Sequence, residues 1–359
     1  MEGQEPQAKR QNFSGEHLAS YSNRDGEADE KHYFKTYSDL YVHEEMLRDF
    51  ERTSKYRSAI MENSHLLNGK VVADIGAGTG ILSCFCAQAG AKKVYAIEGS
   101  DAAEHARRVV QSNNLEDCIT VIHGMVEECQ LPEKVDVIVS EWMGYFLMYE
   151  SMLSSVLYAR EQWLKPDGVM LPSHASIFVA PVRADNFWED RVNCWSRMKD
   201  AYGVDMSCLT DVVMRTTLRS VQVVQLDGED IIGDSTCVLS LDLKSTTQSD
   251  LEKLVGTFKC QCHCSAPLHG LGVWFVVTFP GKPPVLLSTS PYAVSTHWRQ
   301  CVLFLNAPTN VVQDDIVEGS LTLSPCGKHN RFLKVSLVCK LPGSAEPLEK
   351  EFILDDNTC

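Results

Sequence analysis

The sequence predicts an α/β protein in two parts, a doubly wound parallel sheet followed by a β-barrel. The chain has 359 residues, of which 44% are apolar, and this is about twice the usual length of one domain, so we expect two cores. After Gly69, apolar strands alternate with helical stretches, which is typical of a parallel sheet. After Leu171 and Pro172, short β-branched runs separated by Gly and Pro replace that alternation, which indicates a sandwich or barrel.

The first elements follow from periodicity. Residues 1–31 are polar and lack a repeat, so we expect a disordered tail. The pattern becomes helical from Tyr33, and residues 32–172 are expected to form the first domain. Its strands are predicted at Val71–Ile75, Val94–Ile97, Ile119–Ile122 and Val135–Ser140.

The second domain is expected over residues 173–359, and one helical stretch interrupts it. Asp185 to about Leu209 carries large apolar side chains at helical spacing. Such an insertion either covers its own barrel or reaches a neighbouring subunit, and the residues alone do not distinguish these alternatives.

Charge and composition limit the function classes. The net charge of -15 argues against a protein that follows nucleic-acid phosphates and favours a cationic substrate, although acidity also serves solubility. No apolar run reaches the roughly 18 residues of a membrane span, and residues 1–20 lack the apolar core of a signal peptide. We therefore expect an intracellular protein that does not bind membranes.

A glycine-rich turn joins the first predicted strand to a helix. Asp74 is followed by Gly76, Gly78 and Gly80, a spacing that lets the main chain approach a nucleotide-like ligand. Ile81 stands where a dinucleotide fingerprint has Gly or Ala, so NAD is disfavoured.

Two acids extend this site. Glu98 ends the second strand, where a carboxylate can accept hydrogen bonds from both ribose hydroxyls. Glu127 follows the third strand and is placed to bind an adenine amino group, although alone it would suggest a solvated loop acid. No Lys or Arg near the loop faces a pyrophosphate, so the three positions describe an adenosine without phosphate, and S-adenosylmethionine fits.

A pair of carboxylates follows the fourth strand. Glu141 comes directly after it, and Glu150 lies nine residues on, with Gly144 available for a turn. Ligands of open α/β sheets bind beyond the carboxyl ends of the strands. Two acids in one site repel each other unless a cation separates them, and a guanidinium matches paired carboxylates with its fork of N–H donors. The alternative is that Glu141 caps a strand and Glu150 decorates a surface helix.

A cysteine-rich stretch suggests a metal site only weakly. Cys260, Cys262, His263 and Cys264 are close in sequence, but alternate positions fit one face of a strand and no second cluster completes a tetrahedral set. We therefore predict no metal.

Three motifs in order resemble those of the protein arginine methyltransferases. The stretch Ser140–Met152 is similar to the double-glutamate loop of that family. Tyr33–Tyr37 with His43–Leu47 resembles its N-terminal signature, and Thr296–Trp298 its late loop. The subfamily that the chain most resembles is the sixth of the type I group, through Gly203–Leu209 and through His269 and Gly270 before Val273–Phe275. The resemblance implies a Rossmann-like class I methyltransferase domain, a β-barrel and a helical dimerisation arm at about 185–209.

The resemblance also assigns residues. It implies that Arg52 binds the methionyl carboxylate of the cofactor, and the spacing of Glu45, Asp49 and Arg52 predicts that they share one helix face. An imidazole at His297, oriented by Asp49, could take up the proton lost on transfer or could only join the domains. The remaining implied residues are His43 and Tyr37 for the cofactor, Met46 for the reacting centre, and Met152, Tyr145 and Trp298 for the substrate pocket.

Met46 and the late loop match the asymmetric-dimethylating type. The resemblance further implies a homodimer, histone and Gly/Arg-rich substrates, residence in the nucleus (or the cytoplasm) and a role in transcription.

Two rival interpretations exist: an enzyme that methylates nucleic acids or metabolites, and a scaffold without activity. Base-methylating enzymes commonly carry Asn/Asp-Pro-Pro-aromatic after the fourth strand, where this chain has Glu141-Trp142-Met143-Gly144. Cofactor binding without turnover would identify a scaffold.

Overall fold

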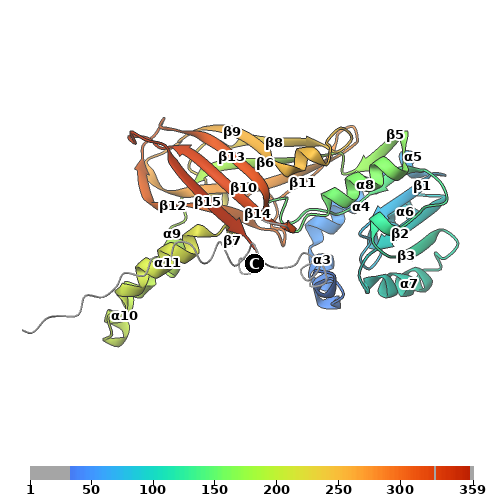
Figure 1. Cartoon of the computed structure of the whole chain (residues 1–359), viewed down its shortest axis with the longest axis horizontal. Coiled ribbons are helices and arrows are strands. Elements are labelled where there is room, and N and C mark those ends of the chain that lie inside the picture. Colours follow the sequence, from blue (N-terminus) through green and yellow to red (C-terminus); the bar gives the residue numbers. More distant parts are fainter. Residues whose placement is uncertain (1–32, 327–328, 356–359) are drawn as a thin grey trace, which may run out of the picture.

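The computed structural model describes residues 33–326 and 329–355 (Figure 1). The predicted disordered tail, residues 1–31, lies outside the described residues. Residues 33–36 are helical, and six α-helices and five strands follow between residues 40 and 171. The helices are α3 (Leu40–Arg48), α4 (Phe50–Glu62), α5 (Ser64–Leu67), α6 (Ile81–Gln88) and α7 (Ala102–Ser112). The strands are β1 (Val71–Ile75), β2 (Lys93–Glu98), β3 (Ile119–His123), β4 (Val135–Val139) and β5 (Leu164–Leu171), with α8 (Leu153–Trp163) before β5.

These five strands form one parallel sheet in the order β3-β2-β1-β4-β5. Every residue of β1 is buried, as expected for a central strand that is covered on both sides. The ends of the four predicted strands lie within one residue of the ends of β1 to β4. Because all five strands run the same way, the carboxyl ends of β1, β2 and β4 meet at one edge, where ligands of such sheets bind.

The second part is antiparallel. One sheet has six strands, in the order β7-β12-β10-β6-β8 with β11 on β10, and the other has four, β15-β14-β13-β9. Strands β8 and β9 bring the two sheets together. Their bounds are β6 (His174–Val182), β7 (Gln222–Val224), β8 (Thr236–Asp242), β9 (Leu254–Gln261), β10 (Ala266–Phe279), β11 (Val285–Ser288), β12 (Gln300–Val311), β13 (Ile316–Cys326), β14 (His329–Lys340) and β15 (Leu348–Leu354).

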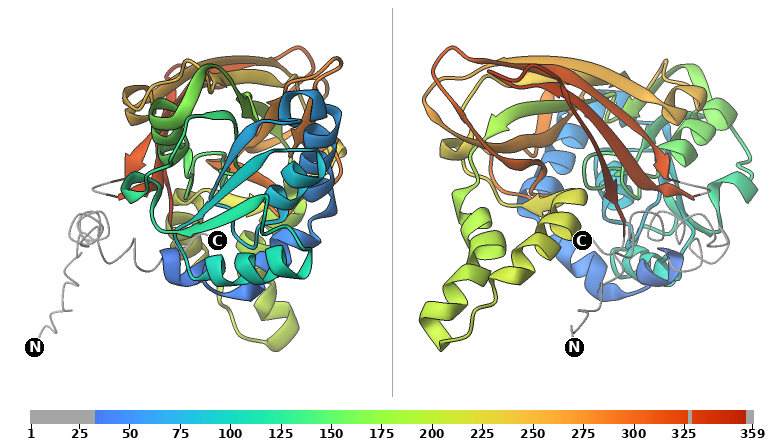
Figure 2. Two further views of the ribbon diagram at one scale, coloured as in Figure 1. Left: turned by 90° about the vertical axis from the view of Figure 1, so that its right-hand side faces the viewer. Right: turned by 60° about the vertical axis from the view of Figure 1, so that its left-hand side comes forward.

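A helical arm stands out from this β-rich part (Figures 1 and 2). It contains α9 (Asp185–Trp188), a π-helical stretch (Glu189–Asn193), α10 (Cys194–Tyr202), short 3-10 turns (Ser207–Leu209 and Thr217–Arg219) and α11 (Thr210–Thr216). Its base is anchored where the Phe187 ring stacks on Phe304 at 4.5 Å. The prediction ended the arm near residue 209, but α11 returns along it, so the helical region is longer than predicted.

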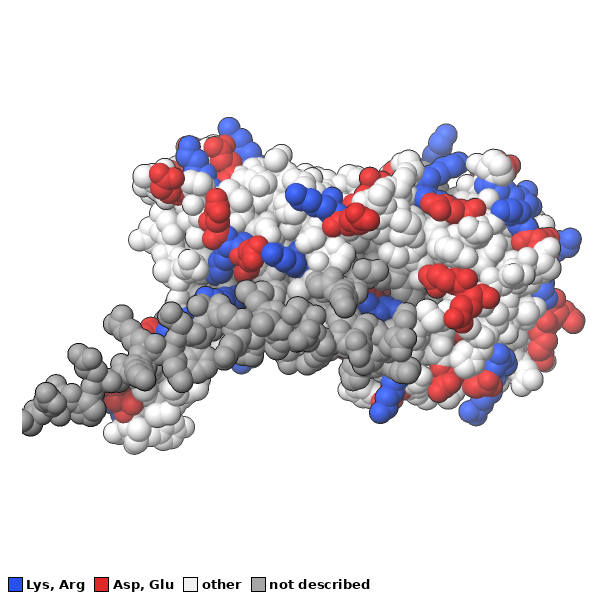
Figure 3. Space-filling view, in the orientation of Figure 1, with Lys and Arg blue, Asp and Glu red and all other residues white. Residues whose placement is uncertain are grey.

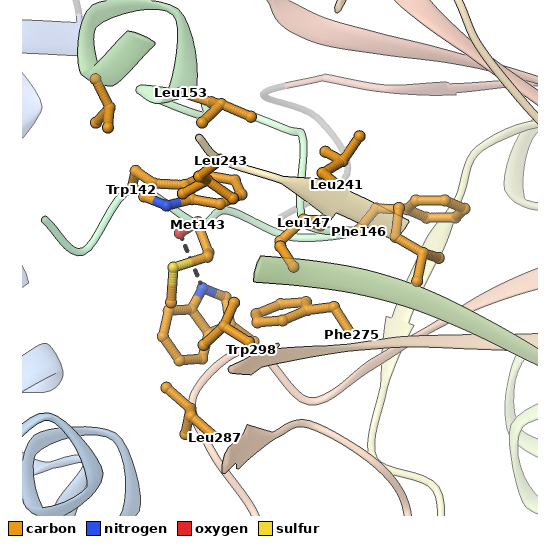
Figure 4. Close-up of a cluster of buried hydrophobic side chains, with 14 of the residues drawn as sticks. Trp142, Met143, Phe146, Leu147, Leu153, Leu241, Leu243, Phe275, Leu287 and Trp298 are labelled. Carbon is orange, nitrogen blue, oxygen red and sulfur yellow. Dashed lines mark hydrogen bonds between the residues drawn. The ribbon is translucent and has the colours of Figure 1, made fainter. Parts of the chain in front are cut away.

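A shared apolar core joins the two parts (Figure 4). The loop after β4 contributes Trp142, Met143 and Leu147, which are buried against side chains of the antiparallel sheets such as Phe275. The Trp298 indole N–H donates to the main-chain carbonyl of Met143 at 3.2 Å. The loop that carries both predicted carboxylates is therefore held between the two domains.

Among the described residues, no helix is long and apolar enough to cross a membrane. On the face shown in Figure 3, Lys and Arg are interspersed with Asp and Glu. Such mixing differs from the basic stripe that a nucleic-acid-binding face commonly carries.

Candidate active site

A cavity of about 690 Å³ lies at the carboxyl edge of the parallel sheet and extends to the β-rich domain. This volume is within the usual range of small-molecule sites. All of the predicted site residues except Asp49 and Asp74 line it: Tyr37, His43, Met46, Arg52, Gly76, Gly78, Glu98, Glu127, Glu141, Tyr145, Glu150, Met152, His297 and Trp298. The fold thus brings together residues that span more than 250 positions of sequence (from Tyr37 to Trp298).

The glycine loop after β1 forms one wall. Gly76 and Gly78 have φ angles of 70° and 55°, a left-handed conformation that other residues rarely adopt. A methyl group on Gly78 would lie 3.1 Å from the His43 ring, and one on Gly76 would overlap the Met152 side chain. The bare main chain therefore borders the cavity, as a ligand that approaches closely requires.

Glu98 and Glu127 border the same cavity as the loop. The two Glu98 oxygens accept the main-chain N–H groups of Gly78 and Ser100, each at 2.8 Å. One Glu127 oxygen accepts from the Ser155 hydroxyl at 2.7 Å. Since an ionised carboxylate offers about four acceptor positions, both acids are held in place and keep capacity for a ligand.

Asp74 is placed differently from the prediction that it binds the cofactor. It belongs to β1 and is fully buried, and its Oδ2 accepts from the Ser83 hydroxyl at 2.6 Å. Burial raises the pKa of Asp74 to about 7. Its Oδ1 has no hydrogen-bond partner among the described residues. Because its side chain is buried and bound to Ser83 of α6, the helix that follows the glycine turn, Asp74 braces that turn and does not line the cavity.

Glu141 is paired with Arg52. Arg52 Nε and one terminal nitrogen donate to the same Glu141 oxygen at 2.9 and 2.8 Å, and each side chain is only 8% exposed. Another Arg52 nitrogen donates to the Met46 carbonyl at 3.0 Å. The other Glu141 oxygen accepts from the Met143 N–H at 3.2 Å. The arrangement orients Glu141 in the cavity and places a buried arginine at the wall of the same cavity as the glycine loop.

The helix that was predicted to carry Glu45, Asp49 and Arg52 on one face is broken. Helix α3 ends at Arg48, and Asp49 has a ψ angle of 88°, outside the helical range. Asp49 instead caps the next helix, because its Oδ1 accepts the Arg52 N–H at 2.9 Å. The one-face prediction was wrong, since a capping aspartate competes with helix continuation.

Asp49 also holds His297, which lies on the loop between β11 and β12. Asp49 Oδ2 accepts the His297 main-chain N–H at 2.9 Å and lies 2.7 Å from the ring Nδ1. Since a carboxylate only accepts, Nδ1 is the protonated ring nitrogen in this contact. Burial works to raise the pKa of Asp49, but the hydrogen bonds from His297 and Arg52 outweigh it and lower that pKa. The contact fixes the imidazole at the cavity and links the two domains.

The loop that carries Glu150 is a tight turn. The Gly144 N–H donates to the Leu147 carbonyl at 3.1 Å, and Phe146, Leu147 and Glu150 have φ angles of 55°, 66° and 54°. Such angles are strained in non-glycine residues and occur mostly where a functional geometry is imposed. A methyl group on Gly144 would overlap the Tyr149 carbonyl, so the turn needs glycine there. The turn brings both carboxylates to one cavity.

Sequence reasoning missed the contribution of β14. Arg331 and Phe332 line the cavity, and the Arg331 carbonyl accepts the Glu150 N–H at 2.8 Å. Tyr33 lines the cavity too, although the prediction named it only as part of a motif. No motif or spacing in the sequence links Arg331 and Phe332 to the other site residues, so their place in the cavity was not predictable.

The cysteine-rich stretch is divided between the core and the surface, with His263 and Cys264 exposed. Cys260 and Cys262 are buried, which raises the pKa of each thiol. The His263 ring lies 2.8 Å from an Asp234 oxygen. In the described part of the chain, no group of three or more His, Cys, Asp or Glu side chains is arranged to hold a metal ion.

Comparison with known proteins matches both domains. Residues 72–168 match a methyltransferase domain, and residues 173–344 match the arginine methyltransferase oligomerization subdomain. A solved structure, the Trypanosoma brucei PRMT1 enzyme-prozyme heterotetrameric complex with AdoHcy, is similar with a TM-score of 0.82 and 37% identity, over 89% of this chain and 100% of that chain.

Two relatives are similar over most of their length. Protein arginine N-methyltransferase 6 of Danio rerio is 44% identical over 95% of this chain and 98% of the relative. The protein of the same name from Xenopus tropicalis is 48% identical over 87% and 92%, respectively. The chain therefore belongs to the protein arginine methyltransferase family.

Proposed function

We propose that this protein arginine methyltransferase converts arginine side chains to monomethylarginine and then to asymmetric dimethylarginine, in histones and Gly/Arg-rich proteins. The observation that carries the proposal is the pair Glu141 and Glu150 in one cavity with the glycine loop. A cavity with adenosine-binding features at one end and two carboxylates at the other suits methyl transfer to a cation.

S-adenosylmethionine is the cofactor, and it supplies an electrophilic methyl group carried on a sulfonium. The chain fits it, because the glycine loop, Glu98 and Glu127 border one cavity and Gly76 and Gly78 present bare main chain there. Glu98 and Glu127 would hold the ribose and the adenine, and Arg52 the methionyl carboxylate. His43 and Tyr37 border the same end of the cavity, where the His43 ring Nε2 lies 2.8 Å from the Tyr37 main-chain carbonyl oxygen.

Glu141 and Glu150 would bind the acceptor guanidinium from two sides. A guanidinium remains protonated at physiological pH, and its lone pairs are delocalised. Two carboxylates draw its positive charge toward the nitrogens they contact and leave the remaining nitrogen richer in electron density. Positioning that nitrogen supplies a large part of catalysis, because alignment removes the entropy cost of a bimolecular encounter.

His297 would accept the proton that the guanidinium loses, because its ring is held at the cavity by Asp49. The tautomer follows from that contact: Nδ1 donates to Asp49, so Nε2 is the nitrogen that can receive a proton. The asymmetric outcome is supported by Met46, which lines the cavity, and by Trp298 beside His297 at 4.0 Å between ring centroids.

A homodimer formed through the arm is part of the proposal. The arm exposes Tyr202, Val204 and Val212, and the region of α3 and α4 exposes Tyr41 and Phe50. Apolar side chains at two separate places suit a symmetric dimer in which each arm packs on its partner. Sedimentation of the parent and of a variant with Tyr202, Val204 and Val212 replaced by Ser should give a dimer and a monomer, respectively.

We further propose residence in the nucleus, with a role in transcription, and basic tails as substrates. The net charge of -15 favours basic partners by electrostatic attraction. Fluorescence microscopy of the tagged chain in cells tests the location, and a uniformly cytoplasmic signal would contradict it.

The reaction is tested by incubating the protein and a Glu150→Gln variant with S-adenosylmethionine and a Gly/Arg-rich peptide or histones. Mass spectrometry with fragment ions separates asymmetric from symmetric dimethylarginine. The proposal expects asymmetric product from the parent and a large loss in the variant. Symmetric product alone would contradict the type, and cofactor binding without product from any substrate would favour a scaffold.

A further inference from the structure

Arg331 brings an additional cation to the cavity from the far end of the chain. It lies near the start of β14, and its guanidinium carbon is 3.4 Å from the centroid of the Tyr33 ring. It is also 5.7 Å from the Phe34 ring centroid. A guanidinium within about 6 Å of an aromatic ring is attracted by the negative face of that ring.

Tyr33 belongs to the segment of residues 33–38, which borders the cofactor end of the cavity. A methyl group on Gly99, the residue after Glu98, would come within 2.6 Å of the Phe34 ring, so Phe34 lies directly on that turn. Ser100 donates to the Tyr37 carbonyl at 3.2 Å. The segment is therefore fixed on one side to the turn that carries Glu98.

The aromatic side chains of the segment pack on one another. Tyr33 and Tyr37 have ring centroids 4.5 Å apart, and Tyr33 and Phe34 are 5.4 Å apart in an edge contact. Burial raises the pKa of the Tyr33 phenol, so its ring is neutral at physiological pH. The contact with Arg331 is consequently one of a cation with a neutral ring, and it is partly shielded from water.

The main chain of Arg331 contacts the turn that carries Glu150. Its carbonyl accepts the Glu150 N–H at 2.8 Å, and Glu150 has the left-handed φ angle of 54°. The next residue, Phe332, stacks on Tyr149 with an interplanar angle of 8°. One residue of the β-rich domain thus touches both the cofactor-side segment and the turn that presents Glu150.

We propose that Arg331 is a positioning residue that couples closure of the 33–38 segment over the cofactor to the placement of Glu150 in the acceptor site. The inference deepens the proposed function and rests on it for the role of Glu150. Arg331 acts through Tyr33 on one side and through the Glu150 turn on the other.

The coupling is tested with Arg331→Gln, Tyr33→Leu and the double variant, each characterised by S-adenosylhomocysteine affinity in calorimetry. A partly desolvated cation–π contact corresponds to roughly tenfold in affinity, so each single variant should bind about tenfold more weakly. The double variant should be no weaker than the weaker single variant, because the two changes remove the same contact. Tyr33→Phe keeps the ring and should bind within roughly twofold of the parent.

Lys334→Gln is the matched control. Lys334 lies on the same strand and pairs with Glu351, and it is not among the residues that line the cavity. The Lys334→Gln substitution removes one positive charge of β14 and should leave the affinity for S-adenosylhomocysteine unchanged. Arg331→Lys keeps a cation with less ring overlap and should restore part of the affinity, which separates the contact from folding defects.

Turnover adds a readout that a purely structural role would not change selectively. Arg331→Gln should raise the KM for S-adenosylmethionine and lower kcat, with a melting temperature close to that of the parent. Additive losses in the double variant, unchanged affinity in both single variants, or tighter peptide binding by Arg331→Gln would overturn the inference. If the parent makes no methylarginine, the proposed function fails, yet the affinity cycle still decides whether Arg331 holds the segment.

Discussion

Replacing Asp49 by Asn removes a carboxylate whose two oxygens accept three N–H groups. Oδ1 accepts from the Arg52 main chain, and Oδ2 accepts from both the main chain and the ring of His297. An amide has one acceptor oxygen, and its NH₂ group faces a donor on whichever side it is placed. Asp49→Asn therefore breaks either the helix cap or the link to His297.

The cost can be worked from these contacts. The Asp49 side chain is 3% exposed and the His297 side chain 17%, so solvent screens the pair only weakly. Losing the cap costs about 1 kcal/mol, and losing the charged acceptor of a hydrogen bond costs about 1.5 to 3 kcal/mol. We therefore expect Asp49→Asn to destabilise the protein by about 1 kcal/mol if the cap is lost and by about 1.5 to 3 kcal/mol if the link to His297 is lost.

Urea denaturation followed by tryptophan fluorescence measures this change. Asp39→Asn is the matched control, because Asp39 is exposed and caps α3 through the Tyr41 N–H at 2.9 Å, with no second hydrogen bond to its side chain within residues 33–326 and 329–355. Asn caps helices as well as Asp, so the control should match the parent. The lowered pKa of Asp49 means that its contribution is present at neutral pH and is lost as the pH falls below about 4. The reasoning would be refuted if the free energy of unfolding of Asp49→Asn at pH 7 lay within about 0.5 kcal/mol of that of Asp39→Asn.

Three further changes test other parts of the site. Gly144→Ala should cost about a hundredfold or more in kcat/KM, because the methyl group would push the Tyr149 carbonyl and the turn away. The melting temperature should fall as well, since the turn is held in the buried core. Parent-like kinetics would contradict this. Asp74→Asn should stabilise the protein relative to the parent at pH 8 and not at pH 3.5, because the raised pKa of Asp74, about 7, makes the folded state lose stability as the pH rises from about 4 to about 7. If the urea midpoints of the variant and the parent differed by the same amount at both pH values, the raised pKa of Asp74 would be contradicted. Glu98→Gln should weaken S-adenosylhomocysteine binding in calorimetry by about tenfold or more, because an amide nitrogen would face a main-chain N–H, and unchanged affinity would show that Glu98 is not needed.

The sequence was sufficient for the parts of the fold that depend on local patterns. The strands β1 to β4 were predicted within one residue, because buried parallel strands are short apolar runs bounded by turn signals. The glycine loop and the double-glutamate turn were also recognisable, since glycine at Gly76 and Gly144 is required by geometry that only glycine allows.

Other features depend on contacts between distant segments. The break at Asp49 arises because its carboxylate caps α4 and also holds His297, and a helical repeat cannot reveal that second partner. Asp74 lies on a strand that is buried at every position and its carboxylate is bound to Ser83, so its proximity to the glycines did not imply a ligand contact. Arg331 reaches the cavity through the pairing of β13 with β14, and no spacing links it to Glu150.

The measurement that tests the central claim most directly is peptide binding in calorimetry, with S-adenosylhomocysteine present and with an arginine peptide compared with its lysine counterpart. We predict that the parent prefers the arginine peptide and that Glu150→Gln and Glu141→Gln each lose most of this preference. Glu346→Gln, at an exposed position, should keep it. Equal binding of both peptides by the parent, or an unchanged preference in both cavity variants, would contradict the account that the two carboxylates hold the guanidinium.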